Sequence, residues 1–118
     1  EDGKLHIMDY KTCSFGWGKK QKTDKMIAYQ LVLYKHFFAQ RYEIDPNDIE
    51  VHFCLLKRTA KKNVVEVFSI TSGEKRTNNA LELMTRAIKT IKSKIHIKNK
   101  LACTKGYGCE FYKTEHCK

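Results

Sequence analysis

The hydrophobic and polar positions of this chain recur in two different periods. Apolar residues at helical spacing predict a first helix, which Thr23 or Asp24 can cap, and a second helix opened by the polar stretch before Glu74. Shorter runs rich in Val, Ile and Phe predict strands. The expected elements are a strand at 4–11, a helix at 24–42, antiparallel strands at 49–58 and 63–71, and a helix at 74–93. This order predicts an α/β fold in which helices flank a mixed sheet.

The remaining segments carry no such periodicity. Residues 12–23, with two glycines and a basic end, are expected to form a loop, and residues 94–118 form a basic tail that holds three cysteines. We find no internal repeat and no boundary of composition. A length of 118 residues therefore predicts a single domain over 1–118 with one core.

Charge narrows the classes of function. The chain has 23 Lys and Arg against 13 Asp and Glu, a net charge of +10, which favours an anionic partner, most often nucleic acid. No apolar run approaches the roughly 20 residues that span a bilayer, and no signal peptide is recognisable. Five cysteines, an odd number, argue against a secreted disulfide framework and favour a reducing, cytoplasmic setting.

The first strand ends in polar residues whose chemistry is open to two interpretations. Alternation places Asp9 and Lys11 on the face that also carries Ile7. They are either a solvated ion pair, which contributes little, or a metal-binding carboxylate beside a lysine that stabilises negative charge. On the first helix, Gln30 and Tyr34 are four residues apart and share a face. They are either polar residues at the edge of the core or groups that hold a phosphate.

The stretches "IMDYKT" and "YQLVLY" together resemble the RecB-like branch of the PD-(D/E)XK nuclease superfamily. In that branch a strand ends in Asp-x-Lys, which Asp9 and Lys11 match, and a following helix carries Gln-x-x-x-Tyr, which Gln30 and Tyr34 match. The resemblance implies a restriction-endonuclease-like core and a metal-dependent DNA phosphodiesterase of DNA repair, recombination or phage DNA processing. It also implies Mg²⁺ or Mn²⁺ at Asp9 and the backbone carbonyl of Tyr10, with these four side chains as the catalytic group.

The same resemblance assigns DNA contacts and a cell type. Lysines of the first loop would contact phosphates, namely Lys19, Lys20, Lys22 and Lys25, and the basic stretch 57–62 could add to them. Phe15 and Trp17 either stack on bases or pack beneath the loop, and packing is slightly favoured. A bacterial or phage-infected cell would suit such a nuclease.

One departure from the family pattern concerns a second acid. The family places another metal-binding acid on the strand that precedes this one, across the turn at residues 1–3. We therefore expect a fragment of a longer protein, a site completed by a missing N-terminal segment or an additional chain, or a lost activity. The alternative function is a catalytically incomplete nucleic-acid-binding module of the same fold.

The tail cysteines leave three readings open. Cys103, Cys109 and Cys117 resemble the C-terminal cysteines that hold a 4Fe-4S cluster in some RecB-like nucleases, although the usual C-x2-C pair is absent. The second possibility is a zinc ion bound by these cysteines and His116 or His96, within a cysteine-rich interaction domain. The third is that the three cysteines are plain thiols. Cys54 is expected in the core and Cys13 as a spectator. His6 and His52 lie on predicted strands, where histidines are more often surface or core residues than ligands.

Overall fold

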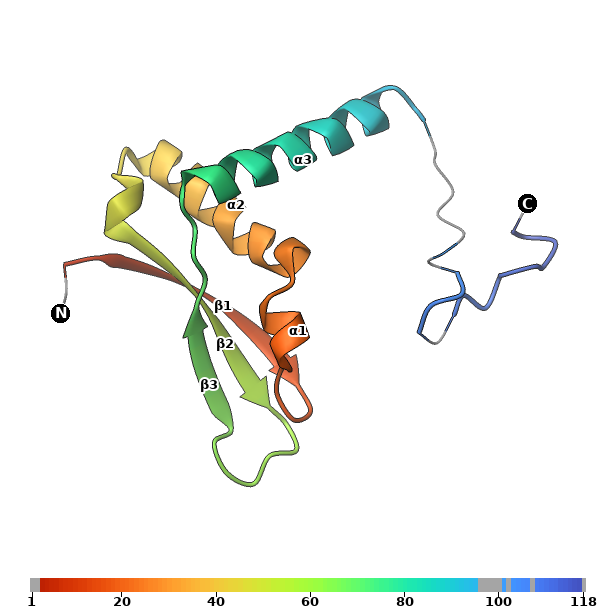
Figure 1. Ribbon diagram of the computed structural model, residues 1–118, viewed down its shortest axis with the longest axis horizontal. Helices are drawn as coiled ribbons and strands as arrows, with labels where there is room; N and C mark the ends of the chain where they lie inside the picture. The colour runs from red at the N-terminus through yellow and green to blue at the C-terminus, as the bar shows by residue number, and fades with distance from the viewer. Residues whose placement is uncertain (1–2, 96–100, 102, 107, 118) are drawn as a thin grey trace. The chain divides into compact units, whose positions relative to one another are not determined.

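The structure is a computed structural model that describes residues 3–95, 101, 103–106 and 108–117 (Figure 1). The chain divides into two compact units, Glu1–Thr85 and Arg86–Lys118. Helix α3 (Glu74–Lys92) begins in the first unit and ends in the second.

The first unit is built on a three-stranded mixed sheet in the order β1-β2-β3. Its elements are β1 (Leu5–Cys13), α1 (Lys19–Lys22), α2 (Lys25–Tyr42), the 3-10 turn η1 (Pro46–Asp48), β2 (Ile49–Lys57) and β3 (Val65–Ser69). Strand β1 runs parallel to β2, and β3 runs antiparallel to β2. The expected α/β class, the mixed sheet and the antiparallel β2–β3 pair are therefore confirmed.

The long helix α2 begins and ends where local chemistry dictates. The Asp24 carboxylate accepts a hydrogen bond from the Met26 N–H at 2.8 Å and so caps the first turn. At the other end Glu43 adopts the left-handed conformation with φ of 54°, and its N–H bonds to the Ala39 carbonyl. These two caps confirm the helix predicted over 24–42.

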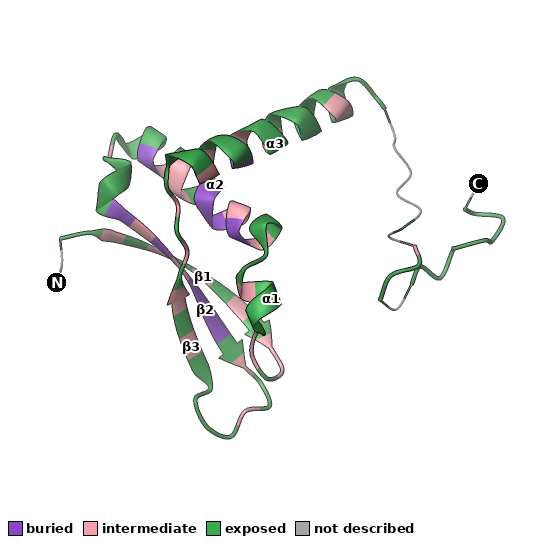
Figure 2. Cartoon of the chain, in the orientation of Figure 1, coloured by how far each residue is buried: buried purple, intermediate pink, exposed green. Residues whose placement is uncertain are grey.

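The core lies between α2 and one face of the sheet. Leu31 of α2 and Val51, Phe53 and Leu55 of β2 are fully buried together. Figure 2 shows buried positions in purple on both α2 and β2. Ile7 of β1 packs against the same cluster. Because β2 is the middle strand, its alternate residues fill the core, as expected for a half-buried strand. Cys54, on β2, is also buried, as predicted.

The prediction of a loop over residues 12–23 is wrong at two places. Strand β1 continues to Cys13, and Lys19–Lys22 form the single helical turn α1, closed by hydrogen bonds from the N–H of Lys22 to Gly18 and of Thr23 to Lys19. This turn has no buried residue. A helix without an apolar face leaves no periodicity in the sequence, so hydrophobic patterning could not reveal it.

The second unit joins the end of α3 to the cysteine-bearing tail. In its described part, residues 101–117 contain turns and no helix or strand. The Cys109 N–H bonds to the Cys103 carbonyl at 3.0 Å, and the Cys117 N–H bonds to the Thr114 carbonyl. The irregular tail predicted from the sequence is confirmed for these residues.

Candidate active site

Strand β1 presents Asp9 and Lys11 to the face of the sheet that α2 covers. The alternation of the strand places them on the side of Ile7, which packs into the core. Both side chains are partly buried, with 18% of Asp9 and 32% of Lys11 exposed. The apolar start of β1 is thus anchored, and its polar end lies where the core gives way to solvent.

Helix α2 brings the other two predicted residues to the same place. The Lys11 ammonium donates a hydrogen bond to Gln30 Oε1 at 3.0 Å, and Gln30 Nε2 donates to the Tyr34 hydroxyl at 2.9 Å. The four residues predicted from two separate motifs therefore form one connected group. The Tyr34 side chain is half exposed, so its hydroxyl is within reach of a ligand.

The Asp9 carboxylate carries an oxygen without a hydrogen bond. Lys11 Nζ lies 3.0 Å from Asp9 Oδ2, but the contact is an ion pair without hydrogen-bond geometry. This buried oxygen accepts no hydrogen bond from the residues that the structure describes. The ammonium of Lys11 compensates part of the charge on this oxygen, and a carboxylate oxygen is also the ligand that Mg²⁺ and Mn²⁺ prefer.

Tyr10, between Asp9 and Lys11, contributes only backbone atoms to the face of the sheet that α2 covers. Tyr10 occupies the alternate position of β1, and its side chain is 63% exposed. Only its carbonyl group was predicted to be a ligand. The chemistry of the donor set, one carboxylate and one carbonyl, suits a hard divalent cation that takes its remaining ligands from water and phosphate.

The basic loop separates into exposed and paired lysines. Lys19, Lys20 and Lys25 are exposed. Lys22 instead forms an ion pair with Glu66 of β3, and its ammonium lies 5.2 Å from the centre of the Phe68 ring. The structure therefore presents three of the four predicted phosphate contacts to solvent and engages the fourth within the fold.

Glu66 holds two lysines of the predicted basic surface. Lys57 Nζ lies 2.8 Å from its second carboxylate oxygen. The hydrogen bond from Lys22 lowers the pKa of Glu66 below its ordinary value, and the hydrogen bond from Lys57 lowers it further. These contacts join α1 to the β2–β3 hairpin beside the candidate site.

The two aromatic residues of the first loop differ in burial. The Trp17 ring packs 5.2 Å from the Phe53 ring and 6.1 Å from the Phe68 ring, measured between centroids. The slight preference for packing is therefore confirmed for Trp17. Phe15 is 80% exposed, so the expectation of packing is wrong for this residue, and its ring faces solvent where a base could stack.

The three tail cysteines influence one another within the second unit. Desolvation raises the pKa of the Cys103 thiol, and the neighbouring thiols of Cys109 and Cys117 raise it further. No disulfide is formed among the described cysteines. His116 contacts Glu115 at 3.6 Å, and His96 lies outside the described residues. The iron–sulfur and zinc readings of this tail stay predictions.

A second polar group, which the sequence did not reveal, lies on the opposite face of the sheet. His6, Glu50 and His52 offer three potential ligand atoms within 4.8 Å of one another. The sequence favours surface or core positions over ligand roles for the two histidines. The sequence held one partial signal of this group, because strand alternation places Glu50 and His52 on one face of β2. Their meeting with His6 depends on the parallel register that pairs His6 with Glu50, and this register is not written in any local pattern.

The first unit belongs to the α/β class of folds and contains a three-stranded mixed sheet. Comparisons with protein-family models, with curated proteins and with solved structures found no match. Within the described part of the chain, no helix is both long enough and apolar enough to cross a membrane. Glu1 and Asp2, the acidic residues at the turn across which the family's second acid is expected, lie outside the described residues.

Proposed function

We propose that this chain carries the site of a Mg²⁺- or Mn²⁺-dependent deoxyribonuclease with a restriction-endonuclease-like core. One observation carries the proposal. The Asp-x-Lys strand end and the Gln-x-x-x-Tyr helix are joined by contacts that run from Asp9 through Lys11 and Gln30 to Tyr34. A solvated surface pair would not require a glutamine amide and a phenol from another element to complete it.

Asp9 and the Tyr10 carbonyl are the groups that would hold the metal ion. The buried Asp9 Oδ2, which lacks a hydrogen bond from the described residues, supports this assignment. When bound, the ion would lower the pKa of a water molecule and neutralise charge on the scissile phosphate. The work of orienting the reacting groups then falls to the neighbouring side chains.

The amide of Gln30 links Lys11 to Tyr34 in a fixed direction. A lysine ammonium only donates hydrogen bonds, so the amide oxygen must face Lys11 and the amide nitrogen must face Tyr34. The phenol oxygen then accepts from the amide, and its own O–H is left to donate outward. Tyr34 can therefore donate to a phosphate oxygen.

Lys11 occupies the centre of the group. Its ammonium has three donors, one of which goes to Gln30. The contact with Asp9 at 3.0 Å holds the charge beside the carboxylate. A further donor can stabilise the negative charge that develops during hydrolysis, which is the usual role of such a cation.

The open edge of β1 supports the expectation of a further strand at this site. In the order β1-β2-β3, the described sheet has no strand on the outer side of β1. Edge strands pair readily with an added strand. An additional segment or chain placed there would lie directly beside Asp9 and could bring a second carboxylate.

One observation favours the alternative of a binding module without catalysis. Among the described residues, no group of three close metal-ligating side chains includes Asp9. A single carboxylate provides a weak metal site, whereas the net charge of +10 suits DNA binding in either case. The two functions differ in whether phosphodiester bonds are cut.

The decisive experiment follows degradation of single- and double-stranded DNA with Mg²⁺ or Mn²⁺. We expect metal-dependent cleavage that is reduced at least about a hundredfold by Lys11→Ala, the size of effect typical for a lost electrostatic donor. Asp9→Asn should abolish the response to metal. The matched control is Lys75→Ala, which removes an exposed lysine from α3.

Cleavage that survives both Asp9→Asn and Lys11→Ala would refute this site. If this chain binds DNA but does not cleave it, the assay is repeated with an N-terminally extended form where the gene encodes one. Binding without cleavage by either form would leave the binding module.

A further inference from the structure

The cluster on the far face of the sheet has the dimensions of a metal site. His6 Nδ1 lies 2.9 Å from His52 Nε2, and His52 Nε2 lies 3.9 Å from Glu50 Oε2. Ligand atoms around a tetrahedral zinc ion are separated by about 3.3 Å, as follows from metal–ligand distances of roughly 2.0–2.1 Å. The three atoms therefore lie within small side-chain adjustments of a shared ion.

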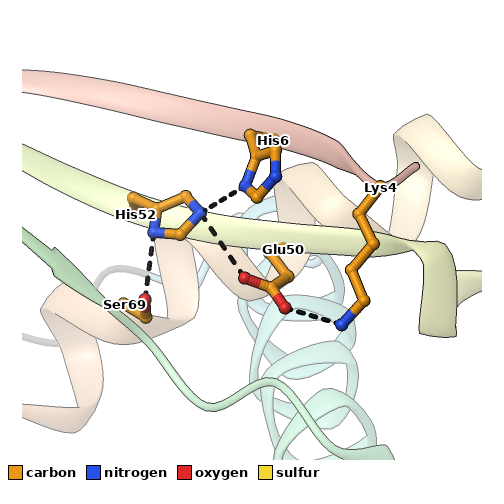
Figure 3. A network of polar contacts seen from close by, with 5 residues as sticks. All are labelled: Lys4, His6, Glu50, His52 and Ser69. Atoms are coloured by element: carbon orange, nitrogen blue, oxygen red, sulfur yellow. Dashed lines mark hydrogen bonds and ion pairs between the residues drawn. The ribbon is translucent and has the colours of Figure 1, made fainter. Parts of the chain in front are cut away.

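Two of the three candidate ligands are already oriented by neighbours (Figure 3). His52 Nδ1 lies 3.0 Å from the Ser69 hydroxyl, which can accept from an Nδ1–H and so leave the lone pair on Nε2, the nitrogen that faces His6. Lys4 binds Glu50 Oε1 at 2.7 Å, and the other oxygen, Oε2, faces His52. Such outer contacts to a ligating imidazole and carboxylate are typical of metal sites.

We infer that His6, Glu50 and His52 bind Zn²⁺, or a similar divalent transition-metal ion, on the face of the sheet opposite α2. Two imidazoles and one carboxylate suit zinc rather than Mg²⁺, which prefers oxygen ligands. Three protein ligands leave a fourth position for water or an exogenous ligand. Since residues of β1 alternate between faces, this ion is separate from the one proposed at Asp9.

The site connects strands that are remote in the sequence. His6 belongs to β1, whereas Glu50 and His52 belong to β2, which is reached only after α2. An ion that binds all three ligands binds the folded sheet and not the unfolded chain. Zinc should therefore raise the thermal unfolding temperature of the protein in a concentration-dependent way.

The test must separate this cluster from the tail cysteines, because thiolates are zinc ligands as well. We would use the full chain with Cys103, Cys109 and Cys117 replaced by serine, and titrate Zn²⁺ by calorimetry. We expect binding of one ion that weakens at least about a hundredfold in His52→Gln. Ser69→Ala should weaken it about tenfold, as is usual for an outer partner of a ligating histidine.

The matched control is His36→Gln. This histidine lies on α2, its ring packs on Phe37, and its loss should leave zinc affinity unchanged. Because His52→Gln could disturb the sheet, Glu50→Gln, which keeps the shape of the side chain, is measured as well, with circular dichroism as the check of folding.

The inference is overturned if the chain without its three tail cysteines binds no zinc. It is also overturned if a folded His52→Gln or Glu50→Gln protein binds zinc as tightly as the parent. Equal affinity for Mg²⁺ would overturn the assignment to a transition metal. None of these outcomes depends on DNA cleavage, so the inference stands or falls apart from the proposed nuclease.

Discussion

Phe53, at the centre of β2, is the buried residue that lies beside Asp9 of the candidate site. Its side chain is fully buried, its backbone is the register partner of Asp9 in β1 and of Phe68 in β3, and its ring contacts that of Trp17. We predict that Phe53→Ala destabilises the protein far more than any substitution on the opposite face, and that it loosens the strand that carries Asp9.

The magnitude follows from burial and from the space left behind. Truncation of a buried Phe to Ala typically lowers the free energy of unfolding by about 3–5 kcal/mol, because transfer and cavity terms add. A domain the size of the first unit has about 4–13 kcal/mol of stability in total. The loss is therefore a large fraction of the whole, and the midpoint of thermal unfolding should fall by more than about 12 °C.

Leu56→Ala is the matched control on the same strand. Leu56 points to the opposite face and remains 37% exposed, so no enclosed cavity forms when it is shortened. Its loss should lower the free energy of unfolding by about 1 kcal/mol, from the apolar surface that it buries. The difference between the two variants should reach about 2 kcal/mol or more.

The assay is urea unfolding of the full chain, followed by Trp17 fluorescence and by circular dichroism. Trp17 is the only tryptophan, and its packing on Phe53 makes it a local probe, whereas circular dichroism reports on the helices. Coincident transitions would justify a two-state treatment. Equal losses in Phe53→Ala and Leu56→Ala, at unchanged m-value, would refute the assignment of the core to the α2 face.

Two further predictions concern charge. Because the lysine contacts hold the pKa of Glu66 below its ordinary value, they stabilise the protein above the unfolded pKa, and this contribution disappears as the pH falls through the folded pKa. Glu66→Gln should therefore lower the free energy of unfolding by up to about 1 kcal/mol at pH 7, and this loss should shrink steadily as the pH is lowered through the acid range. A loss that stays the same across a pH series in urea unfolding would contradict this reasoning. Replacing Lys19, Lys20 and Lys25 together by glutamine should reduce the slope of log K against log salt for duplex DNA by about 2.7, at roughly 0.9 for each phosphate contact; an unchanged slope in anisotropy titrations would remove α1 and the start of α2 from the DNA-binding surface.

The elements with strong local signals were predictable from the sequence. Asp24 caps α2, and the apolar spacing that follows it is that of a helix. The run of β-branched and aromatic residues in β2 predicted its burial. Asp9 and Lys11 at the end of β1, with Gln30 and Tyr34 one turn apart on α2, could be recognised because each pair is close in sequence and shares a face.

Features that depend on long-range register were not predictable in the same way. The parallel pairing of β1 with β2 sets His6 beside Glu50, 44 residues later, and no local pattern contains that information. The packing of Phe15 and Trp17 was unpredictable for the same reason. Both residues belong to one glycine-containing loop, and only the tertiary fold decides which ring meets Phe53. The pairing of Lys22 with Glu66 likewise required the β2–β3 hairpin to be in place.

The register of β1 positions the residues of both proposed sites. Asp9 pairs with Phe53 and Lys11 with Leu55, so the carboxylate and the ammonium stand beside the two residues that bury most deeply in β2. A slip of one residue would turn every side chain of β1 to the other face, exposing Ile7 and moving Asp9 away from α2. The cost of exposing Ile7 opposes that slip, because the other face carries His6 and the exposed Met8 instead. The apolar half of β1 therefore fixes the face on which its polar half lies. The same register that turns Asp9 and Lys11 toward α2 also places His6 beside Glu50 and His52.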